Sequence, residues 1–158
     1  MRTEIRIAGT GRMGVVLAGV IVGHAAVVHA GLNAVQSQSY GSEARGTAAK
    51  SEVIISDGVI KYPKVRWSDY FVVMSQKALE LYADDAKKGS VVIADPDLVD
   101  FTSIQTQYEV VPIHAIKTAD EVGLRLAANM VMLGALVKKS RVFSIEALEC
   151  AVTDMVPK

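Results

Sequence analysis

Residues 5–14 read I-R-I-A-G-T-G-R-M-G, a short β-type run that breaks at Gly9. The run through Ala8 predicts a strand, and the apolar pattern over residues 13–30, which stops at Gly31, predicts a helix. Strand, glycine turn and helix in this order open many α/β folds with a mostly parallel sheet. We therefore expect the rest of the chain to alternate in the same way.

A second strand is predicted at Asn33–Ser39, where the two-residue period places Gln36 and Gln38 on one face. Asp57-Gly58 then separates two apolar runs, residues 51–56 and 59–62, and this pattern predicts an antiparallel β-hairpin.

The remaining two thirds of the chain alternate between apolar strands and helical patterns. We predict strands at 70–74, 91–94 and Glu109–Pro112. A helix is predicted from the N-cap Ser75 to about Lys88, with Gly89 as its stop. Two further helices are predicted, one over 122–137 that starts at the capping-box spacing of Thr118 to Glu121, and a last one from Ser144 to Met155. These elements predict a Rossmann-like, three-layer α/β fold with a mostly parallel sheet, a β-hairpin insertion and one domain over residues 1–158.

Charge and hydropathy exclude two classes of protein. The 158 residues hold 17 Lys and Arg against 17 Asp and Glu, so no net positive charge attracts nucleic acid. Residues 13–42 carry no charged side chain, but His24, His29 and two glycines interrupt the apolar run, and no basic cluster flanks it. We therefore expect a cytoplasmic protein that binds neither membrane nor nucleic acid.

Few side chains in the chain have the spacing of a metal or catalytic site. Cys150 is the single cysteine. An iron–sulfur cluster normally needs about four thiolates and a structural zinc site several Cys or His ligands, so we expect this chain alone to hold neither. His24 and His29 lie five residues apart on the first helix, and we predict that they do not share a face as paired zinc ligands would. His114, in a loop after Pro112, is a weak candidate for a ligand contact. The sequence predicts no catalytic residue and no metal site.

The glycine turn is the first candidate site. Gly9, Gly11 and Gly14 match G-x-G-x-x-G between a strand and a helix, where backbone amides face an anion, and Arg12 lies within the turn. Dinucleotide sites of this type also use an acidic residue about twenty positions later. Between Gly14 and Glu43 the sequence has no carboxylate side chain. A dinucleotide, another anionic ligand or partner group, and a purely structural turn all remain open.

The second candidate site is the polar stretch 36–46, which follows the second strand. It is too polar for a core and too rich in hydrogen-bond donors for an ordinary linker, although a solvated loop stiffened by a Glu43–Arg45 contact is also compatible with its composition. Ligands of open α/β sheets bind at the carboxyl ends of strands, which favours a binding role. The candidate residues are Gln38, Ser39, Tyr40, Gly41, Glu43, Arg45 and Gly46.

These motifs resemble a known family. Residues 34–56, AVQSQSYGSEARGTAAKSEVIIS, together with the glycine turn, Ser75-Gln76 and residues 128–135 (ANMVMLGA), are similar to the gamma subunit, or gamma-equivalent domain, of the 2-oxoacid:ferredoxin oxidoreductases. The matches run in order along nearly the whole chain. Where relatives often carry glycine and glutamine in the first turn, this chain has Arg12 and Met13.

The resemblance implies a subunit without a complete active site. Thiamine diphosphate, Mg and the iron–sulfur clusters would be held by partner chains, namely alpha, beta and ferredoxin-like delta subunits, and coenzyme A would be a shared substrate. The glycine turn and the loop from Gln38 to Gly46 would then help to form the coenzyme A site. The resemblance slightly favours 2-oxoglutarate over pyruvate as the substrate. The alternative is a stand-alone nucleotide- or dinucleotide-binding Rossmann-like protein.

Overall fold

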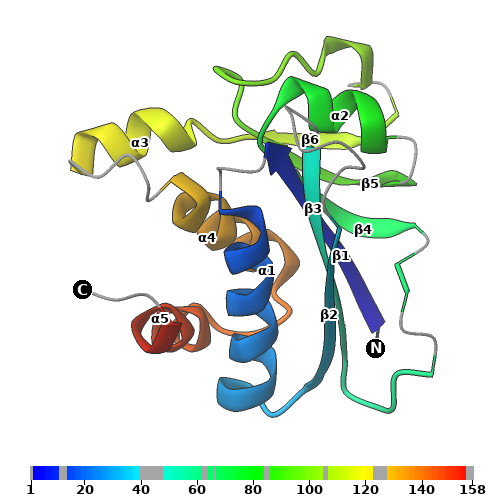
Figure 1. Ribbon diagram of the computed structural model, residues 1–158, viewed down its shortest axis with the longest axis vertical. Helices are drawn as coiled ribbons and strands as arrows, with labels where there is room; N and C mark the ends of the chain where they lie inside the picture. The colour runs from blue at the N-terminus through cyan, green and yellow to red at the C-terminus, as the bar shows by residue number, and fades with distance from the viewer. Residues whose placement is uncertain are drawn as a thin grey trace.

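A computed structural model describes residues 2–10, 14–39, 48–61, 64–65, 67–83, 86–104, 107–122 and 128–155 (Figure 1). Its strands are β1 (Arg2–Thr10), β2 (Asn33–Ser39), β3 (Ala48–Ser56), β4 (Ser68–Val73), β5 (Ala86–Ala94) and β6 (Glu109–Pro112). Its helices are α1 (Val15–His24), the π-helical η1 (Ala25–His29), α2 (Gln76–Tyr82), the 3-10 turn η3 (Thr102–Ile104), α3 (Ala115–Val122), α4 (Ala128–Ser140) and α5 (Ile145–Met155).

The six strands of the described residues form one sheet in the order β2-β3-β1-β4-β5-β6. The pairs β1–β4, β4–β5 and β5–β6 are parallel, whereas β3 runs antiparallel to both β1 and β2. Five strands therefore point the same way and end at one edge, which we call the carboxyl edge. The predicted mostly parallel sheet is confirmed.

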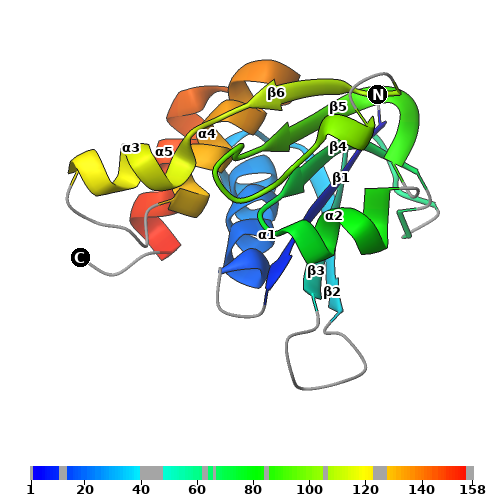
Figure 2. The same ribbon diagram turned by 90° about the horizontal axis from the view of Figure 1, so that it is seen from above.

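Helices cover both faces of this sheet (Figure 2). One core packs α1, η1, α3, α4 and α5 against one face, where Ile5, Ile7 and Val53 are fully buried. The other core packs α2 and the segment after β5 against the opposite face, around Phe71 and Val73. The predicted three-layer α/β arrangement is confirmed.

The first helix, α1, lies very close to β3. A Cβ atom added to Gly19 would lie 2.7 Å from the Ser51 Cβ and nearer still to the Ser51 Oγ. Ser51 is fully buried, and its Oγ accepts a hydrogen bond from the Gln36 side chain of β2 at 3.1 Å. Only glycine lets the helix backbone lie this close to the strand.

The predicted hairpin around Asp57-Gly58 is wrong, because residues 59–61 are not a strand. Both sides of β3 are already paired, with β1 on one and β2 on the other, so no ladder is left for a second arm. The antiparallel hairpin instead consists of β2 and β3. Asp57-Gly58 still makes a turn, in which Gly58 N–H donates to the Ser56 Oγ at 3.0 Å.

The helix predicted to run from Ser75 to about Lys88 is shorter, because the chain enters β5 at Ala86. Gly89 does not stop a helix. It lies within β5 with φ of 80°, and its N–H donates to the carbonyl of Gln107 at 3.0 Å. The N-cap is confirmed, since the Ser75 Oγ accepts a hydrogen bond from the Ala78 N–H at 3.1 Å.

The capping box predicted at Thr118 to Glu121 is also wrong, since both residues lie inside α3. The start of α3 is fixed by a residue distant in sequence, because the buried Asp95 carboxylate accepts a hydrogen bond from the Ile116 N–H at 3.0 Å. The next helix, α4, starts at Ala128. The final helix is as predicted, and the Ser144 Oγ accepts from the Ala147 N–H at 3.1 Å.

The first helix ends in a π-helical turn, and this corrects the interpretation of His24 and His29. In an α-helix, residues five apart differ by about 140° around the axis. A π turn is wider, with i to i+5 hydrogen bonds, so residues five apart lie on the same side. Both imidazoles therefore face α5.

None of the helices in the described part of the chain is long and apolar enough to cross a membrane.

Gly19→Ala should lower the free energy of unfolding by about 1–3 kcal/mol, because α1 must move away from β3 to admit the methyl group. Gly134→Ala in α4 is the matched control, since a Cβ there meets no atom within 4 Å. The control should be neutral or stabilising by up to about 1 kcal/mol. Urea unfolding of both variants measures the difference.

The effect of Gly19→Ala should shrink in a Ser51→Gly background, which removes the side chain that the methyl group meets. Equal destabilisation in both backgrounds would show that the Gly19–Ser51 approach does not limit packing.

Candidate functional site

The strand ends next to the two predicted site segments lie at the same place on the carboxyl edge. Gly9 and Thr10, which end β1, pair with Ala49 and Ala48, which begin β3. Ser39, which ends β2, pairs with Lys50 two residues further along β3. Ser39 and Ala48, which flank residues 40–47 (segment 40–47), therefore lie two strands and one strand from the end of β1.

The helix that follows the glycine turn starts without a side-chain cap. Its N-cap is Gly14, with φ of 70° and ψ of 27°, and its first turn holds no acidic residue. In contrast, Ser75 caps α2 and Ser144 caps α5. Because the N–H groups of a helix's first turn lack partners within the helix, this start is suited to binding an anion.

The face of β2 that lies under α1 carries a small polar network. The Gln36 Nε2 donates to the Gln38 Oε1 at 3.0 Å and to the Ser51 Oγ at 3.1 Å. This arrangement confirms the prediction that the two glutamines share a face. Gln38 is exposed and lies two residues before segment 40–47.

The structure describes only some of the predicted site residues. Gly9 is buried in β1, Gly14 begins α1, Gln38 lies on β2, and Ser39 ends that strand. The others lie outside the described residues: Gly11, Arg12, Tyr40, Gly41, Glu43, Arg45 and Gly46.

Asn129 is a residue of this region that sequence reasoning missed. It lies on α4, is 7% exposed, and directs its Nδ2 at the Gly14 carbonyl at 3.4 Å. Its Oδ1 is buried and has no hydrogen-bond partner among the described residues. A Cβ on Gly14 would lie 2.6 Å from the Asn129 Nδ2. One signal was available, because Asn129 is the single polar side chain in residues 126–137.

On the opposite face of the sheet, charged side chains join β1 to β3. Arg6 is 2% exposed, and its Nε and one terminal nitrogen lie 2.9 Å and 2.6 Å from the Glu52 Oε2. Nearer the carboxyl edge, Lys50 lies with its Nζ 5.2 Å from the centre of the Tyr82 ring. Lys50 lies two residues after Ala48, where β3 begins.

The far side of the carboxyl edge is acidic. Asp95 is fully buried after β5, and its two carboxylate oxygens accept hydrogen bonds from the N–H groups of Asp97 and Ile116. His114 is exposed after β6, with its Nδ1 3.1 Å from the Asp97 Oδ2. His114 does lie at the carboxyl edge, as a ligand contact would require.

An open depression beside α2 continues this acidic side. Residues 96–102 and Gln76 line it, and the Gln76 Oε1 accepts a hydrogen bond from the Asp100 N–H at 2.7 Å. Hydrogen bonds from the Thr102 hydroxyl and N–H lower the pKa of Asp100 below its ordinary value. An ionised carboxylate here disfavours an anionic ligand, so anion binding is favoured at the α1 side of the edge.

This geometry is typical of a Rossmann-like chain that binds an anionic group at the start of its first helix. Residues 4–158 match the family described as pyruvate ferredoxin/flavodoxin oxidoreductase. The 2-oxoglutarate synthase subunit KorC of Methanothermobacter marburgensis is 50% identical over 163 residues, which cover 99% of this chain and 88% of that protein.

Two solved structures are similar as well. The gamma subunit of a keto/oxoacid ferredoxin oxidoreductase from Geobacter sulfurreducens is 43% identical, with a TM-score of 0.84, over 98% of this chain and 87% of that chain. A 2-oxoglutarate:ferredoxin oxidoreductase from Magnetococcus marinus, with 2-oxoglutarate, coenzyme A and succinyl-CoA bound, is 27% identical with a TM-score of 0.85. That match covers 97% of this chain and 27% of the larger one.

The chain therefore belongs to the pyruvate ferredoxin/flavodoxin oxidoreductase family, as an oxidoreductase subunit of the gamma type.

Asn129→Leu should leave the isolated chain as stable as the wild type, or more stable by about 1–2 kcal/mol, because it removes a buried carbonyl oxygen that lacks a partner. It also removes the contact between the Asn129 Nδ2 and the Gly14 carbonyl, so we expect it to weaken the binding of a ligand at the start of α1. Urea unfolding of the chain and the KM for coenzyme A in the reconstituted enzyme measure the two effects.

Met132→Leu, buried one turn further along α4, is the control and should cost less than about 1.5 kcal/mol without changing that KM. A large loss of stability in Asn129→Leu would make Asn129 a purely structural residue.

Proposed function

We propose that this chain is the gamma subunit of a 2-oxoglutarate:ferredoxin oxidoreductase and that its glycine turn and the loop from Gln38 to Gly46 complete the coenzyme A site. In the reaction, 2-oxoglutarate, coenzyme A and two oxidised ferredoxins give succinyl-CoA, carbon dioxide, two reduced ferredoxins and a proton. Choice of this 2-oxoacid is supported by the 50% identity to a 2-oxoglutarate synthase subunit over nearly the whole chain.

The observation behind this proposal is the position of the strand ends next to the two segments. Gly9 and Thr10 precede the glycine turn, Ser39 and Ala48 flank residues 40–47, and all four lie at the carboxyl edge on β1, β3 and β2. The uncapped start of α1 offers N–H groups to a phosphate of coenzyme A. Arg12 and Arg45 belong to these two segments and would add positive charge toward the same phosphates.

The redox cofactors are proposed to lie in partner chains. An iron–sulfur cluster is normally held by about four thiolates, and Cys150 is the one cysteine of this sequence. The donors of this chain therefore do not fit a cluster. We propose alpha and beta chains that hold thiamine diphosphate and Mg, a ferredoxin-like delta chain that holds the clusters, and a cytoplasmic location for the complex.

A stand-alone dinucleotide-binding protein is not favoured. In the dinucleotide fold, a carboxylate at the end of the second strand, which lies next to the first, binds the ribose. Here β3 separates β2 from β1, which displaces the end of β2 by about 5 Å relative to that arrangement. In addition, β2 carries amides and hydroxyls but no carboxylate.

Arg45→Ala should leave the unfolding free energy of the isolated chain within about 0.5 kcal/mol of the wild type. In the assembled enzyme it should raise the KM for coenzyme A about tenfold or more, because it removes one charge-assisted contact to phosphate. Steady-state kinetics with coenzyme A varied at saturating 2-oxoglutarate measures this effect.

Lys61→Ala is the control, because this exposed cation follows β3 at the edge opposite the carboxyl edge. It should have wild-type kinetics. An unchanged KM in Arg45→Ala would remove that residue from the coenzyme A site.

Affinity purification of the tagged chain from its native host should recover thiamine-binding and cluster-binding chains in equal molar amounts. The complex should show the visible absorption of iron–sulfur clusters and reduce ferredoxin with 2-oxoglutarate and coenzyme A. Recovery of the chain alone under gentle conditions would contradict the proposal.

A further inference from the structure

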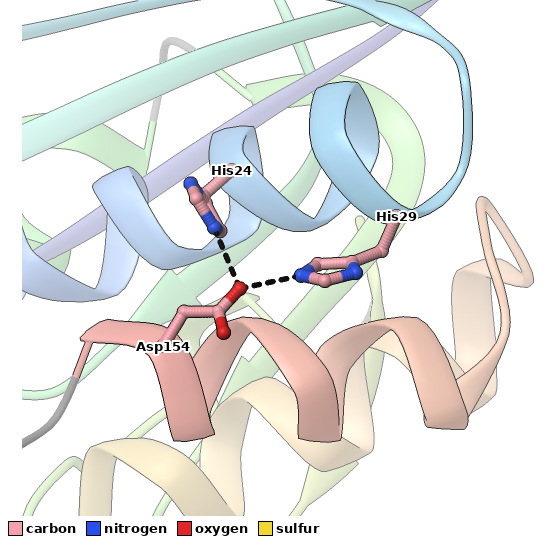
Figure 3. A group of neighbouring side chains, drawn as sticks. All are labelled: His24, His29 and Asp154. Carbon is pink, nitrogen blue, oxygen red and sulfur yellow. Dashed lines mark hydrogen bonds and ion pairs between the residues drawn. The ribbon is translucent and has the colours of Figure 1, made fainter.

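Three side chains meet where α5 packs against the end of the first helix. Figure 3 shows His24 and His29 directed from that helix toward Asp154 on α5. The Nε2 atoms of His24 and His29 lie 3.0 Å and 2.7 Å from the same carboxylate oxygen, Asp154 Oδ2. Residues more than 120 positions apart in the chain thus place two imidazole nitrogens and one carboxylate around a common point.

The spacing of these groups is close to that of a tetrahedral zinc site. Ligand atoms bound to zinc at about 2.05 Å lie about 3.3 Å from one another, and two imidazoles bound through Nε2 place their ring centres about 5 Å apart. The two ring centres here are 5.5 Å apart, with 65° between the ring planes. All three candidate ligand atoms lie within 4.8 Å of one another. Changes in side-chain torsion angles would therefore bring the three ligand atoms to metal-binding distances.

The geometry points to a divalent metal site of the zinc type, with His24 Nε2, His29 Nε2 and one Asp154 oxygen as ligands and a fourth position open to water. Imidazole and carboxylate are ligands that zinc accepts readily. The side chains are 28%, 23% and 45% exposed, respectively, so an ion reaches the cluster directly from solvent. Each imidazole binds as the neutral ring with its proton on Nδ1, and no oxidation or reduction is involved.

One further feature supports this site. The two histidines face α5 because of the π-helical turn, and such turns often occur at functional sites.

A second group of possible ligands among the described residues is less suitable. Asp95, Asp97 and His114 lie close together, but both carboxylate oxygens of Asp95 already accept backbone hydrogen bonds. In the group of His24, His29 and Asp154, by contrast, a metal ion would replace the two hydrogen bonds. The ion would join α5 to the end of α1 that lies away from the glycine turn, so we assign it a role in holding the last helix and not in the reaction.

Titration of the metal-free full-length chain with zinc chloride, followed by calorimetry at neutral pH, should show one equivalent bound with a Kd in the micromolar range or tighter. His24→Gln, His29→Gln and Asp154→Asn should each raise the Kd at least about tenfold. Glu149→Gln makes the same chemical change elsewhere on α5, and Cys150→Ser removes the exposed thiol. Both controls should bind zinc as the wild type does.

Crystals of the wild-type chain soaked in zinc chloride give a readout that needs no variant. The anomalous signal should place one ion about 2.0–2.2 Å from all three ligand atoms. Binding only at millimolar zinc, loss of binding in Cys150→Ser, or an ion located elsewhere would overturn the site and leave these residues as a hydrogen-bonded contact between helices. None of these outcomes bears on the coenzyme A proposal, which concerns the other end of α1.

Discussion

The close approach of α1 to β3 positions the first helix against the sheet. Gly19 brings the helix backbone against the buried Ser51, and Ser51 in turn accepts a hydrogen bond from Gln36 of β2. One contact thus fixes the first helix, the antiparallel strand and the edge strand together. Because β3 lies between β1 and β2, the strand ends that flank segment 40–47 lie beside the end of β1, where the glycine turn begins.

This arrangement supports the proposal that the chain completes a site that other chains share. The α1 side of the carboxyl edge offers an uncapped helix start with no acidic residue in its first turn. The opposite side carries Asp97 and Asp100, which disfavour an anion. Asn129 adds a buried carbonyl oxygen without a partner among the described residues, and such groups are rare in native proteins. We propose that the chain contributes orientation and anion binding, while the redox chemistry belongs to its proposed partners.

Local patterns predicted the parts of the fold that local interactions determine. Strands β2 and β6 have the predicted bounds, Asn33–Ser39 and Glu109–Pro112. Ser75 and Ser144 each cap a helix by accepting a hydrogen bond from the N–H group three residues later. Predictions failed where distant residues decide the outcome. Pairing of β3 on both sides removed the expected hairpin, Asp95 set the start of α3, and a π turn changed which residues face α5. Asn129 escaped notice because its role depends on contact with Gly14, 115 positions away.

We propose that coenzyme A binds against the carboxyl edge of this chain at the start of α1. A structure of the assembled enzyme with coenzyme A bound is the sharpest test. We expect a coenzyme A phosphate within hydrogen-bond distance, about 3 Å, of an N–H group or side chain in residues 9–17 or 38–47. Coenzyme A that contacts only other subunits, with this edge more than about 10 Å from every ligand atom, would contradict it, because no direct hydrogen bond spans that distance.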